Sequence, residues 1–169
     1  MAEFQLAQTF VGLGYFSNAQ SIFKVAGSPE LGQFTSRLQF GMICGALKQV
    51  SIFIAQAQSM RIELDEKCVS VALAARSVYE KTTTTDDQTG SLLDLAGEVM
   101  RAHRLFPIGN SPRVAAIDHS ELTTIFMELI VNAPIEEIGA MNFELAQLVA
   151  HRLPVVPQAV TVMFSGVRL

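Results

Sequence analysis

The chain has 169 residues, half of them hydrophobic and 17% of them charged, and its formal net charge is −4. Because a soluble domain usually carries about a quarter charged residues, we expect part of this surface to be covered by other subunits. The twelve Lys and Arg residues form no basic arm, stripe or tail, so direct binding to the phosphates of nucleic acid is not expected. The length fits a single domain that spans residues 1–169.

The cysteines and the amino terminus bear on the compartment. Cys44 and Cys68 lie in apolar runs and form no CxxC pair, which favours reduced thiols over a disulfide framework or a thiolate metal site. An acid precedes the first base of the chain, so no secretory signal is expected. The most apolar segment, residues 39–59, holds Lys48 near its centre, and we expect no membrane span. The predicted location is the cytoplasm or an assembled particle.

Helical patterns begin at the amino terminus. One helix is predicted over residues 2–11, and a second over about 17–27, where Gly27 suits the carboxyl-terminal stop. Ser28 followed by Pro29 is typical of the start of a further helix.

A buried spine helix is predicted around residues 40–54. Its apolar side chains recur at alternating spacings of three and four residues, as on the inner face of a helix. They are Phe40, Ile43, Leu47, Val50 and Ile54. Gly41 and Gly45 form a GxxxG spacing on this helix, which lets another backbone approach closely. The pair is a candidate for self-association, with ordinary close packing as the alternative.

The middle of the chain is expected to hold a short strand, a helix and a polar loop. Residues 60–64 alternate apolar and charged side chains, as in a half-buried strand. Asp65 is typical of an N-cap and predicts a helix that runs to about Tyr79. Residues 80–90 contain no aliphatic or aromatic side chain. We therefore expect an exposed polar loop there, either a solvated connection or a hinge that contacts a partner.

Capping patterns predict three helices in the second half of the chain. The first begins near Ser91 and ends near residue 105. The second covers residues 122–131, behind the acidic pattern that starts at Asp118. The third begins at Pro134 and runs to about residue 153, with a possible interruption at Gly139.

The C-terminal segment, residues 155–169, is expected to be an extended arm. It contains a predicted strand with Val160, Val162 and Phe164 on one face. The unpaired backbone of such a strand should pair with another edge, either near residues 60–64 of the same chain or in a neighbouring subunit.

The sequence contains no motif for catalysis, a cofactor or a metal ion. His103, His119 and His151 belong to no metal-spaced or catalytic pattern. Gly12 and Gly14 lack the third glycine of a dinucleotide fingerprint, and no phosphate-binding loop follows them. An enzyme would need a catalytic group that only the fold assembles.

Together these features predict a mainly α fold, a bundle-like single domain of about six or seven helices with minor β structure. The first hypothesis for function is a noncatalytic building block that assembles with copies of itself, in a virus or phage shell, a tube or a secretion machine. The alternatives are a helical adaptor or chaperone that binds a hydrophobic segment of a partner protein, and an enzyme whose site is not visible in the sequence. The candidate residues for self-association are Gly41, Gly45, Val160, Val162 and Phe164.

Overall fold

A computed structural model describes residues 2–25, 34–109, 111–118 and 123–167. In these residues the chain forms, in order, α1 (Ala2–Gly12), α2 (Phe16–Val25), α3 (Phe34–Ile43), α4 (Leu47–Ser59), α5 (Glu66–Thr82), α6 (Asp86–Ala102), β1 (Arg113–Asp118), β2 (Thr123–Val131), α7 (Ile135–Arg152) and β3 (Val160–Gly166). The mainly helical class with a small sheet is thus confirmed. The helix start predicted at Ser28 and Pro29, and also His119, lie outside the described residues. No helix in the described ranges is long and apolar enough to cross a membrane.

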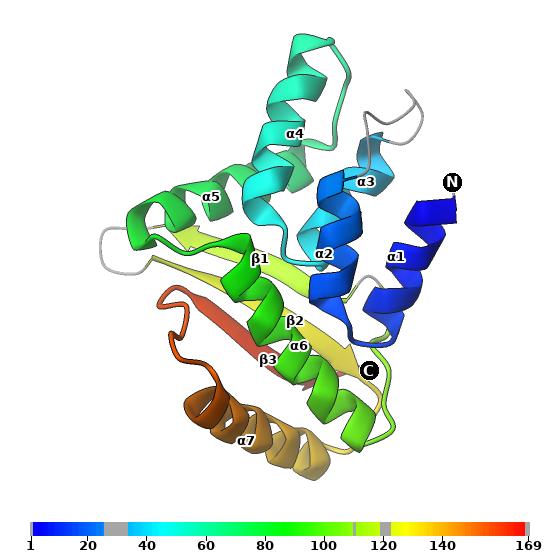
Figure 1. Cartoon of the computed structure of the whole chain (residues 1–169), viewed down its shortest axis with the longest axis vertical. Helices are drawn as coiled ribbons and strands as arrows, with labels where there is room; N and C mark the ends of the chain where they lie inside the picture. Colours follow the sequence, from blue (N-terminus) through cyan, green and yellow to red (C-terminus); the bar gives the residue numbers. More distant parts are fainter. Residues whose placement is uncertain (1, 26–33, 110, 119–122, 168–169) are drawn as a thin grey trace.

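The three strands form one mixed sheet in the order β1-β2-β3. β1 pairs antiparallel with β2, and β3 pairs parallel with β2, so that Phe126 lies opposite both Ala115 and Thr161. The parallel pair is joined through α7, because parallel strands need a long crossover. Figure 1 shows α6 crossing in front of β2 and β3, with α7 alongside β3 at the edge of the molecule.

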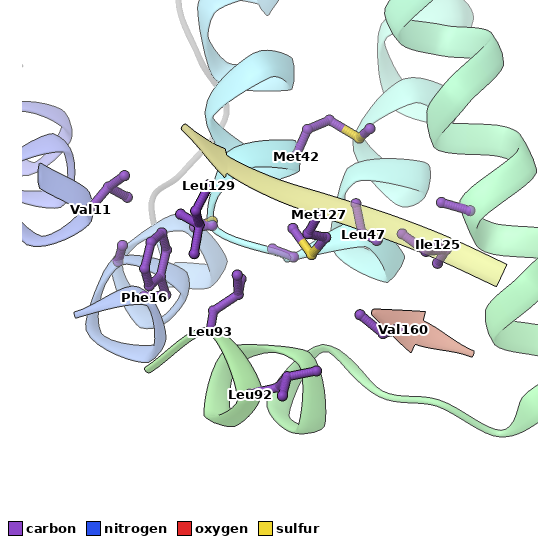
Figure 2. Packing of buried hydrophobic residues seen from close by; sticks show 14 of the residues in the cluster. Val11, Phe16, Met42, Leu47, Leu92, Leu93, Ile125, Met127, Leu129 and Val160 are labelled. Atoms are coloured by element: carbon purple, nitrogen blue, oxygen red, sulfur yellow. The ribbon is translucent and has the colours of Figure 1, made fainter. Parts of the chain in front are cut away.

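The core is centred on one face of β2. Alternate residues of this strand, beginning at Ile125, are fully buried, as the period of two in a strand requires. Figure 2 shows Met127 and Leu129 of β2 on the side of the strand where Phe16 of α2 and Leu93 of α6 lie, and all four belong to one cluster of buried residues. Each fully buried large side chain of this kind stabilises the fold by about 1.5–3 kcal/mol. The helices on this side of the sheet are therefore held by a shared apolar core.

The predicted spine helix is two helices, α3 and α4, because the chain turns sharply between them. Gly45 adopts a left-handed conformation with a φ of +73°. The N–H of Gly45 donates to the carbonyl of Met42, and the N–H of Ala46 donates to the carbonyl of Gly41. These two bonds form a Schellman motif, which ends a helix at a glycine.

The prediction of a polar loop at residues 80–90 is wrong over most of that range. α5 continues to Thr82 and α6 begins at Asp86, so three residues connect the two helices. The hydroxyl of Thr85 accepts a bond from the N–H of Gln88, whose side chain accepts one from the N–H of Thr85. This is a capping box, and it makes the threonine-rich run the start of a helix.

Four further predictions also need correction. Residues 60–64 form a turn followed by chain without regular secondary structure, and the helix predicted over 122–131 is the strand β2. α7 runs through Gly139 without interruption. The predicted C-terminal strand exists as β3, but it pairs with β2 of the same chain and does not pair near residues 60–64.

Candidate functional site

α7 is an outer helix that is attached to the rest of the subunit by one face (Figure 1). Pro134 immediately precedes it, as predicted, and the fixed φ of proline suits a helix start. Ile138, Met141 and Leu145 are buried on the attached face. The opposite face of α7 is exposed at the surface of the subunit.

Asn142 fixes α7 to the outer edge of β3. Its side-chain amide donates to the carbonyl of Phe164 at 3.0 Å, and its Oδ1 accepts from the N–H of Phe164 at 2.8 Å. The parallel ladder binds β2 through residues 159, 161, 163 and 165, so the backbone of Phe164 points away from β2. The amide of Asn142 therefore takes the place that a further strand would occupy.

We expect Asn142→Ala to lower the free energy of unfolding by about 2 kcal/mol, because two partly buried backbone groups lose their partner. The variant should also aggregate more readily, since the edge of β3 becomes available for pairing. Urea denaturation and light scattering measure the two effects. Gln56→Ala, which truncates an exposed amide on α4, is the control. If both variants behave alike, Asn142 does not protect this edge.

Two ion-pair groups tie α7 to α6. His103, at the end of α6, lies between two carboxylates of α7: its Nδ1 is 3.0 Å from Glu137 Oε1, and its Nε2 is 3.0 Å from Glu144 Oε2. The bond to Glu137, followed by that to Glu144, raises the pKa of His103 and so favours its charged form. Arg152 of α7 binds both carboxylate oxygens of Glu98, at 2.7 and 2.8 Å. These contacts set which face of α7 points outward.

The outward face of α7 carries an apolar stripe. Ile135 and Phe143 are 73% and 67% exposed, and the small residues Gly139, Ala146 and Ala150 are exposed on the same side. Spacings of four, four, three and four residues align these five residues along the helix; they are called the α7 stripe below. A contiguous exposed apolar patch marks an interaction surface more often than chance exposure of single side chains does.

The glycines predicted for self-association are buried inside the subunit. A side chain at Gly41 would collide with Phe23 and Val50, and one at Gly45 would collide with Thr89 and Leu93. The GxxxG spacing thus serves close packing within the chain. Self-association through these glycines stays a prediction.

The three candidate residues of the C-terminal strand also face the core. Val160 and Phe164 are buried, and Val162 is partly buried and packs against the core. Sequence reasoning did not single out the α7 stripe. The sequence did carry a signal for it: apolar residues occupy two faces of α7, and since only one face can pack against β3, the other must be exposed.

Two cavities differ in chemistry. One of about 340 Å³ lies between α4, α5 and the start of α6, where Arg76 is paired with Glu80 at 2.7 Å beside Lys48. Another of about 350 Å³ lies between α3, α5 and β1, and its apolar lining includes Met42, Val71 and the Cys68 thiol. Burial raises the pKa of Cys68, so the thiol is held in its unreactive protonated form.

No metal centre is found in the part of the chain that the structure describes, because no three His, Cys, Asp or Glu side chains there could hold an ion together. Comparison of the chain with models of protein families, with curated proteins and with solved structures found no match. Function is therefore inferred from the surfaces of the molecule.

Proposed function

We propose that this protein is a noncatalytic building block that assembles with copies of itself, such as a shell or tube subunit of a virus or phage particle or of a secretion machine. The observation that carries the proposal is the α7 stripe, whose two large side chains are mostly exposed. Covering apolar surface stabilises a complex by about 25 cal/mol per Å² before the costs of association are subtracted. A second protein surface on the stripe would supply that stabilisation.

The neighbouring sequence supports the same conclusion. Val155 and Val156, which follow α7 directly, are 62% and 45% exposed, and Met163 of β3 is 38% exposed. The chain as a whole carries only 17% charged residues, below the usual quarter. Apolar exposure and scarce charge are both typical of subunits whose surfaces are covered in an assembly.

The test is the absolute mass of the protein by light scattering after size-exclusion chromatography, over a wide range of concentration. A discrete oligomer whose population grows with concentration is the expected result, and imaging would then show its shape. A monomer at every concentration would contradict the proposal.

An adaptor or chaperone is the second candidate, and the apolar cavity between α3, α5 and β1 favours it. A volume of about 350 Å³ lies in the range of pockets that hold a ligand or a partner's side chain. This candidate predicts that a labelled peptide with a single large apolar side chain binds, and that Val71→Asp abolishes the binding. A building block predicts that Val71→Asp leaves the oligomeric mass unchanged.

A further inference from the structure

We infer that α7 pairs antiparallel with α7 of a second copy, about a two-fold axis that passes between residues 142 and 143. This inference rests on the proposed function and names the partner of the α7 stripe. Three observations carry it: the symmetry of the stripe, the charges at the two ends of the helix, and the residues along one border of the stripe.

Four of the five positions of the α7 stripe are symmetric about one point of the helix. Ile135 and Ala150 lie equally far from the midpoint between residues 142 and 143, and so do Gly139 and Ala146. A two-fold axis at that point places each member of a pair opposite the other member in the second copy, since such an interface is isologous.

The matched pairs also fit in size. Ile135 of one copy would meet the small Ala150 of the other, and Gly139 would meet Ala146. Small residues at these positions let the two helix axes approach closely. Phe143, which is 67% exposed, would lie beside the axis and pack against Phe143 of the second copy. A parallel pair would instead set Gly139 against Gly139 and leave a gap.

The charges at the ends of α7 favour the antiparallel arrangement. Glu137 and Arg152 are already paired with His103 and Glu98 of the same chain, whereas Glu136 in the first turn is exposed. Antiparallel pairing opposes the two helix dipoles and places the Glu136 residues of the two copies at opposite ends of the pair. Parallel pairing would bring the two acidic first turns together.

One border of the stripe provides a contact between a charged and a neutral side chain, where a second charge can be introduced. Glu136 and Gln147 are exposed and lie eleven residues apart, or about 20° apart around a helix with about 100° per residue. Both therefore lie on the same border of the stripe. The two-fold axis places Glu136 of each copy beside Gln147 of the other.

The expected strength of this contact is modest. Two helices of this length cover less than the roughly 800 Å² per partner of a standard interface. We therefore expect the α7 pair alone to dissociate readily in dilute solution. In an assembly it would be one of several contacts that act together.

Cysteine cross-linking tests the geometry. In a Cys68→Ser background, Gly139→Cys and Ala146→Cys chains of different mass are mixed at high concentration and oxidised with copper phenanthroline, which accepts the electrons of the two thiols. The antiparallel pair predicts a disulfide-linked heterodimer from the mixture and little product from either variant alone. Leu73→Cys, an exposed apolar position on α5, is the matched control and should not cross-link to either chain.

Charge exchange gives a second, independent readout. Gln147→Glu should raise the dissociation constant of the α7 pair about twofold to fivefold, because it places two carboxylates side by side at both ends of the pair. Adding Glu136→Lys to that variant should restore association, since the new contact is attractive. A double variant that associates no better than Gln147→Glu would overturn the antiparallel register.

Light scattering on the unmodified chain separates the two proposals. If the protein forms oligomers but the 139–146 heterodimer does not form, α7 pairing is wrong and the building-block function stands. If the protein is a monomer at every concentration and no cross-link forms, both are wrong. A heterodimer from the mixture, together with rescue by charge exchange, supports both.

Discussion

Gly97→Ala should lower the free energy of unfolding by about 3 kcal/mol, the largest effect expected from removing or adding a single methyl group in this protein. Gly97 lies in the interior of α6, against the turn between α1 and α2. A Cβ there would overlap the carbonyl oxygen of Gly14 and would lie 2.7 Å from its carbonyl carbon. These atoms belong to the backbone, so no change of rotamer relieves the collision.

The turn cannot move away easily. Gly14 has a φ of +72°, which favours glycine. Arg101 holds the same turn by donating to the carbonyls of Leu13 and Gly14, at 2.9 and 2.8 Å. The added methyl group must therefore separate α6 from the α1–α2 turn.

Gly139→Ala is the matched control, and its effect should have the opposite sign. Gly139 also lies in the interior of a helix, but nothing lies within 4 Å of the position of its Cβ. Alanine should stabilise α7 by about 0.5–1 kcal/mol, because glycine loses more backbone entropy. Urea denaturation of the two variants, measured below the concentration of self-association, compares them. Equal effects on stability would show that α6 does not approach Gly14 closely.

The second large effect is expected at Asp86. This residue lies in the first turn of α6, but its carboxylate caps a different helix: it accepts bonds from the N–H of Lys48 at 2.8 Å and of Gln49 at 3.1 Å. Those donors belong to the first turn of α4, whose own N-cap residue, Ala46, has no polar side chain. Asp86→Ala should therefore cost about 3 kcal/mol, from a lost cap and two backbone donors without a partner.

Asp86→Asn keeps an acceptor and separates the hydrogen bonds from the charge. Burial is the main cause that raises the pKa of Asp86 above its ordinary value of 3.8, and the bonds from Lys48 and Gln49 oppose it. Between the ordinary and the raised pKa the folded chain binds more protons than the unfolded chain, so this group stabilises the fold increasingly as the pH falls. Asparagine does not titrate.

The free energy of unfolding of the native protein should thus rise relative to that of Asp86→Asn as the pH falls from about 7 to about 4. Urea denaturation at several pH values measures it. If the difference between the two unfolding free energies stays constant, or if the variant gains stability relative to the native protein, the carboxylate is not desolvated. Glu63→Gln, which neutralises an exposed carboxylate before α5, serves as the control.

Local signals predicted several elements correctly. Asp65 was predicted as an N-cap, and its Oδ1 accepts a bond from the N–H of Cys68 at 2.7 Å. Pro134 predicted the start of α7, and the alternating residues after Pro157 predicted β3. At the two helix starts the deciding interaction lies within about four residues, and for β3 the alternation within the segment itself was the signal, although its partner β2 is distant.

Interactions between distant segments explain the errors. β2 is buried on one face, and Phe126 and Glu128 on its other face are half covered, so its sequence reads as a nearly continuous apolar run. Such a run does not distinguish a strand from a buried helix, and the acidic pattern at Asp118 favoured the wrong choice. The spine pattern continued past Gly45 because α3 and α4 face the same core.

The candidate surface depended on the same kind of information. The sequence predicted α7 but not which of its apolar faces meets the subunit. That choice is made by Asn142 at Phe164 and by His103 between two glutamates, contacts that join residues more than twenty positions apart. The α7 stripe is visible only after those contacts are known.

The order of the strands has a consequence for folding of the chain during its synthesis on the ribosome. β2 is the central strand, yet its parallel neighbour β3 is synthesised only after the whole of α7. At about 5–20 residues per second, the interval between the last residue of β2 and the last of β3 is about 2–7 s. During that time one edge of the most apolar strand has no partner. We expect nascent-chain chaperones to bind in this interval and to leave when β3 emerges.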